Sequence, residues 1–155
     1  MDGVIIYTDG GCSGNPGPGG WAFVIRLPAD DAFRADTEEI VGSGGEADTT
    51  NNRMELRAVI ASLAEAERRA PGAQLVVYTD SQYVKNGISS WISSWKRRGW
   101  RTAANKPVKN RELWEELDAV ADRVKPRFLW VEGHAGIEGN ERCDAMVQAE
   151  IAKFR

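Results

Sequence analysis

The sequence predicts an α/β fold in which helices flank a mixed five-stranded sheet. Three short apolar segments open the chain and are joined by turns rich in Gly, Pro and Asp, which favours an antiparallel meander. After residue 50, helical and strand-like segments alternate, and that order is typical of strands joined through helices in a parallel arrangement. With 155 residues, no repeat and no long linker, we expect a single domain over 1–155.

Local patterns place each element along the chain. Short runs of apolar and β-branched residues predict strands over 3–8, 20–27, 37–44, 75–78 and 127–132. Helical spacing predicts helices over 51–69, 82–88, 89–98, 112–124 and 141–154. The first long helix has the clearest apolar face, formed at i, i+3, i+4 and i+7 by Leu56, Val59, Ile60 and Leu63.

The bulk composition is ordinary for a globular protein and disfavours a membrane protein. Hydrophobic residues make up 42% of the chain and charged residues 28%. Apolar runs are far shorter than the roughly 20 residues of a membrane-spanning helix, and the N-terminus lacks the features of a signal peptide. Cys12 and Cys143 form no CxxC pair, so we expect reduced thiols and a cytoplasmic protein.

Charge is divided unevenly along the chain. The net charge is −3, yet Lys96–Arg111 (KRRGWRTAANKPVKNR) holds seven basic residues and no acidic one, which leaves −10 on the remainder. A basic segment in an otherwise acidic chain indicates a surface for a polyanion such as a nucleic acid. A merely solvated face is the ordinary alternative.

Two aspartates follow apolar strands in matching contexts. Asp9 lies in VIIYTDG (4–10) and Asp80 lies in VVYTDS (76–81), so each follows apolar residues and a Tyr-Thr pair. If the two segments are neighbouring strands, the carboxylates meet at the same sheet edge, where the sites of open α/β sheets form. Turn formation after a strand is the alternative explanation for either aspartate alone.

Two further acids lie near the starts of predicted helices. Glu55 is next to the apolar face of the first long helix, and Asp144 is next to inward-facing Cys143. The helix dipole alone explains an acid in a first turn. Together with Asp9 and Asp80, however, they form a set of carboxylates without a Cys/His set, which indicates a site for a hard cation that prefers oxygen ligands. Zinc is disfavoured because its usual ligands are nitrogen and sulfur. Mg²⁺ fits, with Mn²⁺ as a substitute, and two such ions about 3.5–4 Å apart promote attack of water on a phosphodiester.

Several longer motifs resemble type 1 ribonuclease H of the bacterial kind. They occur in the family's order along nearly the whole chain, as YTDGGCSGNPGPGG, TTNNRMEL, YTDSQYV, WKRRGW with KPVKN, and GHAGIEGNERCD. The resemblance implies the ribonuclease H-like fold and Mg²⁺-dependent endonucleolytic cleavage of the RNA strand of RNA–DNA hybrids. It also implies 5′-phosphate and 3′-hydroxyl products and a monomer. Because the first strand opens the sequence, we expect no separate hybrid-binding domain.

The resemblance assigns the catalytic residues by position. The family's four metal-binding acids are matched by Asp9, Glu55, Asp80 and Asp144. His134 matches a histidine that helps in proton transfer or product release, and an ordinary imidazole pKa of about 6.5 suits that role. It is the only histidine and lies in a glycine-flanked loop, although a lone histidine is more often structural.

The resemblance also implies a hybrid-binding surface. The family's minor-groove contacts are matched by Gly11, Cys12, Asn15, Asn51, Asn52 and Gln82. Amide side chains suit 2′-hydroxyls because they both donate and accept, and glycine lets the backbone approach a sugar. A pocket for a DNA-strand phosphate is matched by Thr50 and Asn110, with Arg53 and Ser81 in support. Plain turn chemistry also explains Asn15 and the residues that follow it.

A basic, Trp-rich segment matches the family's substrate-binding protrusion. Its candidate contacts are Trp91, Trp95, Lys96, Arg97, Arg98 and Trp100. We expect Trp91 and Trp95, one helical turn apart, to be partly core, and Trp100 to offer a platform for a sugar. Binding through such a surface should weaken steeply with added salt.

Two other functions stay open at this level. A catalytically silent hybrid- or RNA-binding module would have lost one or more of the acids, whereas all four are present. A junction resolvase or an integrase-like strand transferase shares scattered acids but lacks the asparagine and tryptophan set. A panel of labelled RNA–DNA hybrid, DNA duplex and RNA duplex separates the three functions.

Overall fold

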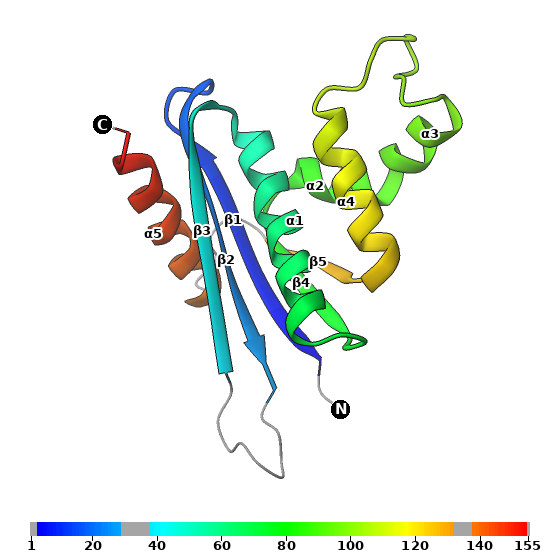
Figure 1. Ribbon diagram of the computed structural model, residues 1–155. Coiled ribbons are helices and arrows are strands. Elements are labelled where there is room, and N and C mark those ends of the chain that lie inside the picture. Colours follow the sequence, from blue (N-terminus) through cyan, green and yellow to red (C-terminus); the bar gives the residue numbers. More distant parts are fainter. Residues whose placement is uncertain (1–2, 29–37, 132–137, 155) are drawn as a thin grey trace.

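A five-stranded mixed sheet forms the centre of the computed structural model, which describes residues 3–28, 38–131 and 138–154 (Figure 1). Its strands are β1 (Val4–Cys12), β2 (Gly17–Leu27), β3 (Glu38–Thr49), β4 (Leu75–Thr79) and β5 (Arg127–Trp130). Their order across the sheet is β3-β2-β1-β4-β5. The first three strands are antiparallel, and β4 pairs in parallel with both β1 and β5. The predicted fold class is therefore confirmed.

Helices cover both faces of this sheet (Figure 1). One face carries α1 (Asn51–Arg69) and α4 (Arg111–Val124), and the other carries α5 (Glu138–Ala152). Between β4 and α4 the chain forms α2 (Gln82–Asn86), the π-helix η1 (Gly87–Trp91) and α3 (Ile92–Arg97). Across the described ranges, no helix combines the length and the apolar character needed to cross a bilayer.

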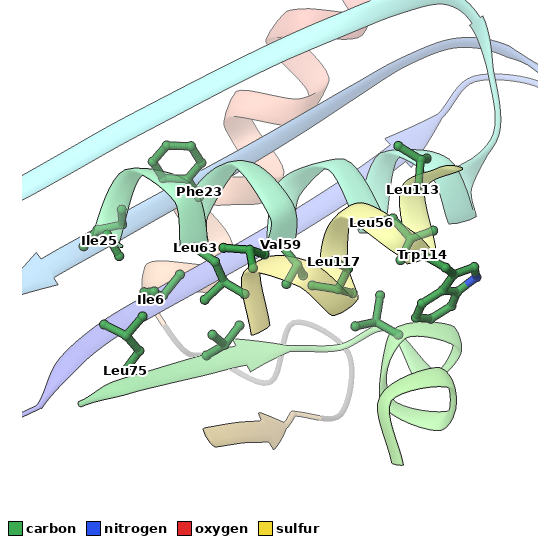
Figure 2. Close-up of a cluster of buried hydrophobic side chains, with 14 of the residues drawn as sticks. Ile6, Phe23, Ile25, Leu56, Val59, Leu63, Leu75, Leu113, Trp114 and Leu117 are labelled. Carbon is green, nitrogen blue, oxygen red and sulfur yellow. The ribbon is translucent and has the colours of Figure 1, made fainter. Parts of the chain in front are cut away.

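The larger hydrophobic core lies between the sheet, α1 and α4 (Figure 2). Leu56, Val59 and Leu63 are fully buried there against Ile6 of β1, as the spacing in the sequence predicts. Ile60, the fourth residue of that face, is partly buried against the same core. Burying each side chain of this kind contributes about 1.5–3 kcal/mol. A smaller cluster holds α5 on the opposite face and comprises Ala22, Val24, Cys143, Val147 and Ile151.

The first two strands are longer than the sequence predicts. The pattern ends the first strand at residue 8, but β1 continues through Asp9 to Cys12. β2 begins at Gly17 rather than at residue 20, so only residues 13–16 form the bend between the strands. Asp9 is therefore an interior strand residue that pairs with Ala22. Turn formation, the alternative explanation for this aspartate, is wrong.

The glycines of this hairpin let helices approach the sheet closely. A Cβ on Gly10 would overlap the backbone of Met54 and Glu55 in α1. A Cβ on Gly20 would lie 2.9 Å from the carbonyl oxygen of Val147 in α5. Tertiary packing against two helices thus requires the glycines and overrides the turn signal that they carry in the sequence.

The helical segment between β4 and α4 contains a π-helical turn that the sequence does not predict. The sequence predicts helices over 82–88 and 89–98, whereas α2, η1 and α3 follow one another without a break. The backbone N–H of Ile92 donates to the carbonyl of Gly87, five residues earlier, as in a π-helix. A Cβ on Gly87 would overlap the indole of Trp114, so the glycine allows η1 to pack directly on α4.

Both cysteines are free thiols, as predicted. Burial raises the pKa of Cys143 to about 12, and its thiol donates to the carbonyl oxygen of Tyr7 at 3.4 Å. Burial also raises the pKa of Cys12. Both groups are therefore protonated near neutral pH and act as small hydrogen-bonding side chains.

Gly10→Ala is expected to lower the free energy of unfolding by about 3 kcal/mol, because the added methyl group overlaps backbone atoms of α1 that cannot rotate away. Gly11→Ala is the matched control in the same strand. Its Cβ would lie 3.3 Å from Cγ1 of Val147, a contact that a small side-chain shift relieves. We expect a change below about 1 kcal/mol for this control. Urea unfolding measures both variants, and equal losses would contradict the packing role of Gly10.

Candidate active site

A cleft of about 410 Å³ lies where β1 and the end of β4 meet the start of α1. Carboxylates reach it from four separate segments of the chain, as Asp9, Glu55, Asp80 and Asp144. Amide side chains share the lining and come from Asn51, Asn52, Gln82 and Gln148. The fold thus gathers all four predicted acids around one cavity.

Three of these carboxylates form a close group. Asp9, Glu55 and Asp80 each offer an oxygen, and these oxygens lie within 4.8 Å of one another. Parallel pairing of β1 with β4 explains why the two aspartates lie close together. Tyr7 lies opposite Tyr78, and Asp9 and Asp80 each follow two residues later in the same direction. The expectation that the two matching segments are neighbouring strands is confirmed.

Glu55 is the carboxylate that burial affects most. Its Oε2 atom has no exposed surface and no hydrogen-bond partner in the described part of the chain. Burial, and then the charges of Asp9 and Asp80, raise the pKa of Glu55 well above its ordinary value, while a hydrogen bond from the Gly10 N–H lowers it in part. A cation among these oxygens would give Oε2 a partner and offset the repulsion, so the donor set fits a hard divalent ion.

Asp144 lines the cleft from α5, on the other face of the sheet. It is half-buried, lies in the second turn of the helix and is not one of the three carboxylates within 4.8 Å. Contacts with Tyr7 position this end of α5: the Cys143 thiol donates to its carbonyl, and a Cβ on Gly139 would overlap its ring. Because Glu55 also lies in a second helical turn, the helix dipole explains neither acid.

The bend between β1 and β2 is tied to the start of α1. Asn15 Oδ1 accepts a hydrogen bond from the backbone N–H of Asn51 at 3.0 Å, and the Cys12 thiol donates to the carbonyl of Thr49 at 3.2 Å. Thr50 is the N-cap of α1, and its hydroxyl accepts from the third residue of the helix. Four of the six residues predicted to contact the minor groove line the cleft itself, namely Gly11, Asn51, Asn52 and Gln82.

Arg53 brings together Thr50 and Asn110, the two residues predicted to bind a DNA-strand phosphate. Its backbone N–H donates to the Thr50 hydroxyl, and its guanidinium donates to Asn110 Oδ1, both at 3.2 Å. Asn110 Nδ2 donates to the hydroxyl of Tyr83 at 3.2 Å, and that hydroxyl also accepts from Trp114 Nε1 at 2.9 Å. Because a guanidinium only donates, these contacts fix the orientation of the Asn110 amide, which can still donate its second N–H.

The three tryptophans of the predicted protrusion are half-buried and pack against the larger core. The ring of Trp95 lies 5.8 Å from that of Trp91 and 6.3 Å from that of Trp100. The expectation that Trp91 and Trp95 are partly core is therefore confirmed. Trp100 packs in the same way, with the Arg111 guanidinium 5.9 Å from its centroid. Its role as a platform for a sugar stays a prediction.

The basic residues at the end of α3 differ in their surroundings. Lys96 forms an ion pair with Asp118 of α4 at 3.1 Å. Arg97 and Arg98 are exposed, and neither forms an ion pair within the described ranges. These two arginines therefore offer the more accessible charge for a polyanion.

Comparison with known proteins identifies the family of this chain. The sequence profile of the RNase H family matches residues 1–152. The chain belongs to the RNase H family. Ribonuclease H of Rhodopseudomonas palustris (strain BisB5) is 54% identical over 152 residues, which cover 98% of this chain and 94% of that protein. The predicted resemblance and enzyme class, a ribonuclease H, are confirmed.

Solved structures of RNase H proteins are also similar. LC9-RNase H1, a type 1 RNase H with the type 2 active-site motif, has a TM-score of 0.86 at 29% identity, over 98% of this chain and 73% of that chain. LC11-RNase H1, solved in complex with an RNA/DNA hybrid, has a TM-score of 0.67 at 25% identity, over 97% of both chains. The similarity therefore extends over nearly the whole of this RNase H.

The sequence pattern does not point to every residue of this RNase H site. Gln148 lines the cleft one helical turn after Asp144, and that i, i+4 spacing is the signal that would identify it. Tyr83 both lines the cleft and bonds to Asn110, and no local pattern marks it. His134 lies outside the described residues, so its role in proton transfer or product release stays a prediction.

Without divalent cations, Glu55→Gln is expected to raise the midpoint temperature of unfolding near pH 8 by at least about 3 °C, which corresponds to about 1 kcal/mol in a chain of this size. Because the folded state raises the pKa of Glu55, it binds that proton more tightly than the unfolded chain does. The wild type therefore loses stability as the pH rises from 4.5 through the folded-state pKa. The variant lacks this loss, so the two proteins should converge in stability near about pH 4.

Thermal unfolding in EDTA across this pH range measures the difference. Glu116→Gln removes the same charge from an exposed position in α4, where the carboxylate makes only a loose ion pair with Arg57 at 3.7 Å, and serves as the control. A gain of equal size in the control would show that net charge, and not the close group of carboxylates, is responsible.

Proposed function

We propose that this RNase H hydrolyses the RNA strand of RNA–DNA hybrids with two Mg²⁺ ions held by Asp9, Glu55, Asp80 and Asp144. The observation that carries the proposal is the close group of three carboxylates, whose oxygens lie within 4.8 Å in a cleft with amide side chains. The complex of LC11-RNase H1 with an RNA/DNA hybrid supports the choice of substrate.

The chemistry that bound Mg²⁺ would supply is a lowered pKa for a water molecule and neutralisation of charge on the attacking and leaving oxygens; Mn²⁺ could substitute. Glu55 would contribute Oε2, the buried oxygen that lacks another partner among the described residues. Water attacks phosphorus as the bond to the 3′ oxygen breaks, which leaves a 5′-phosphate and a 3′-hydroxyl. We assign His134 to proton transfer during this step or to product release.

Recognition of the hybrid follows from the residues beside the carboxylates. Asn51, Asn52 and Gln82 are exposed at the cleft and can donate to and accept from 2′-hydroxyls and base edges in the minor groove. Asn15 retains its amide N–H groups for the same purpose, because only its oxygen accepts from Asn51. The backbone of Gly11 and the side chain of Cys12 would complete this edge.

The DNA strand is assigned to the surface next to these residues. Thr50 and Asn110, joined by Arg53, would bind one of its phosphates. The protrusion would follow the strand beyond that phosphate, through contacts from Trp91, Trp95, Lys96, Arg97, Arg98 and Trp100. We further propose that residues 1–155 act as one catalytic domain, as a monomer and in the cytoplasm.

Asp9→Asn is expected to lower the rate of hybrid cleavage in Mg²⁺ by at least about a hundred-fold, because it removes one of the four carboxylates that would hold the ions. Affinity for the hybrid should change by less than about three-fold, since the amide and basic contacts remain. Labelled RNA–DNA hybrid, DNA duplex and RNA duplex, each incubated with Mg²⁺ or EDTA, provide the measurement.

Asp122→Asn removes an exposed carboxylate from α4 and should leave the rate unchanged. Cleavage by Asp9→Asn at the wild-type rate would contradict the role of Asp9. Cleavage of the hybrid by the wild type in EDTA would contradict the need for a metal, and cleavage of the DNA duplex would contradict the substrate.

Arg97→Gln and Arg98→Gln are each expected to weaken hybrid binding and to reduce the slope of log K against log salt by about 1, because each would remove one phosphate contact. Lys96→Gln should have a smaller effect, since Asp118 already neutralises part of its charge. Fluorescence anisotropy of labelled hybrid over a salt series measures the slopes. Arg127→Gln, exposed at the start of β5 and without an ion pair within the described ranges, is the control; a slope that changes equally in all four variants would indicate a general charge effect.

A further inference from the structure

Trp130 is an exposed aromatic residue with a specific contact beside the cleft. It is the last residue of β5, pairs with Thr79 of β4 and is 37% exposed. Its indole N–H donates to the backbone carbonyl oxygen of Asp80 at 3.1 Å. Because the ring is partly exposed, its burial stabilises the fold only in part. The specific contribution of Trp130 is its indole N–H, which donates to one peptide group.

Asp80 lies between two regular elements and belongs to neither. β4 ends at Thr79, and α2 begins two residues after Asp80. The Thr79 hydroxyl accepts from the backbone N–H of Ser81 at 3.1 Å, and the Ser81 hydroxyl caps α2 by accepting from Val84 N–H at 3.1 Å. The Ser81 N–H and the Asp80 carbonyl belong to one peptide group, so the Thr79 hydroxyl holds its N–H and the Trp130 indole holds its oxygen.

The other two carboxylates of the close group are anchored differently. Asp9 is inside the β1–β2 ladder, where it pairs with Ala22. Glu55 is inside α1, which packs directly against Gly10. Of the three, Asp80 therefore depends most on individual side-chain contacts, and the contact from Trp130 reaches across 50 residues of sequence.

Lys85 contributes to holding the indole in place. Its Nζ lies 4.9 Å from the centroid of the Trp130 ring. Lys85 belongs to α2, the helix that Ser81 caps directly after Asp80. A cation–π contact at an exposed site is modest, but this one links β5 to the element that follows Asp80. Strand pairing on one side and Lys85 on the other thus orient the indole N–H.

We propose that Trp130 is a positioning residue for Asp80, whose peptide it fixes so that the carboxylate stays in the close group of three. This inference rests on the proposed function, because it takes Asp80 to bind a divalent cation. When this hydrogen bond is lost, the peptide keeps the Thr79 contact on its N–H but loses the one on its oxygen, so it can tilt. The Asp80 carboxylate then spends less time within 4.8 Å of Asp9 and Glu55. Metal affinity then falls, while the residues assigned to the hybrid keep their places.

Trp130→Phe tests this inference, because it removes the N–H and keeps an aromatic ring beside Lys85. The expected result is about a five-fold increase in the Mg²⁺ concentration that gives half-maximal cleavage, the size expected for one lost hydrogen bond. At saturating Mg²⁺, kcat and the KM for hybrid should return to the wild-type values. A second readout needs no hybrid: the Mg²⁺ concentration that gives half of the rise in unfolding temperature should increase by a similar factor.

Trp21→Phe is the matched control, because it makes the same chemical change at a partly buried indole that stacks on Phe23 and makes no hydrogen bond within the described residues. Its Mg²⁺ midpoints should equal those of the wild type. Trp130→Leu removes the ring as well and measures the contribution of packing.

Unchanged Mg²⁺ midpoints in Trp130→Phe would overturn the inference, even if that variant unfolds at a lower temperature without metal. Changed midpoints in Trp21→Phe as well would also overturn it, because the effect would then be general to loss of an indole. A wild type whose cleavage and unfolding temperature both ignore Mg²⁺ would instead overturn the proposed metal site on which the inference rests.

Discussion

The fold has to hold three carboxylates close together against their mutual repulsion. Asp9, Glu55 and Asp80 bring oxygens within 4.8 Å of one another, and Oε2 of Glu55 is buried without a hydrogen bond in the described part of the chain. Without a cation this arrangement opposes folding, because burial and repulsion both disfavour the charged form of Glu55. The rest of the fold must therefore keep the group assembled, as is common where a site stores unfavourable interactions.

Two hydrophobic cores on opposite faces of the sheet provide that stability. The larger core fixes α1 and with it Glu55, and the smaller core fixes α5 and with it Asp144. β2 takes part in both, because its successive side chains point to opposite faces. Gly10 and Gly20 then set how closely the two helices approach. Stability and site geometry use the same residues, so a change that loosens either helix also displaces a carboxylate.

Much of this arrangement follows from local patterns and could be predicted. The strands, the apolar face of α1 and the matching contexts of Asp9 and Asp80 are short-range features, and β1 and β4 are neighbours as expected. The differences are long-range. β1 continues through glycines because two helices pack on them, and Tyr83 and Trp130 bond to groups 27 and 50 residues away. No periodicity in one stretch of sequence records a contact of that kind.

The uneven charge of the chain now has a structural explanation. The seven basic residues of 96–111 lie at the end of α3, in the segment after it and at the start of α4, whereas the acids of the cleft come from β1, α1, α5 and the residue after β4. A polyanionic backbone is attracted by the first surface and repelled by the second. Under the proposed function, the cleft accepts a phosphate only after its carboxylates are neutralised. Binding of metal and of the scissile phosphate are therefore coupled before any chemistry occurs, and each must strengthen the other.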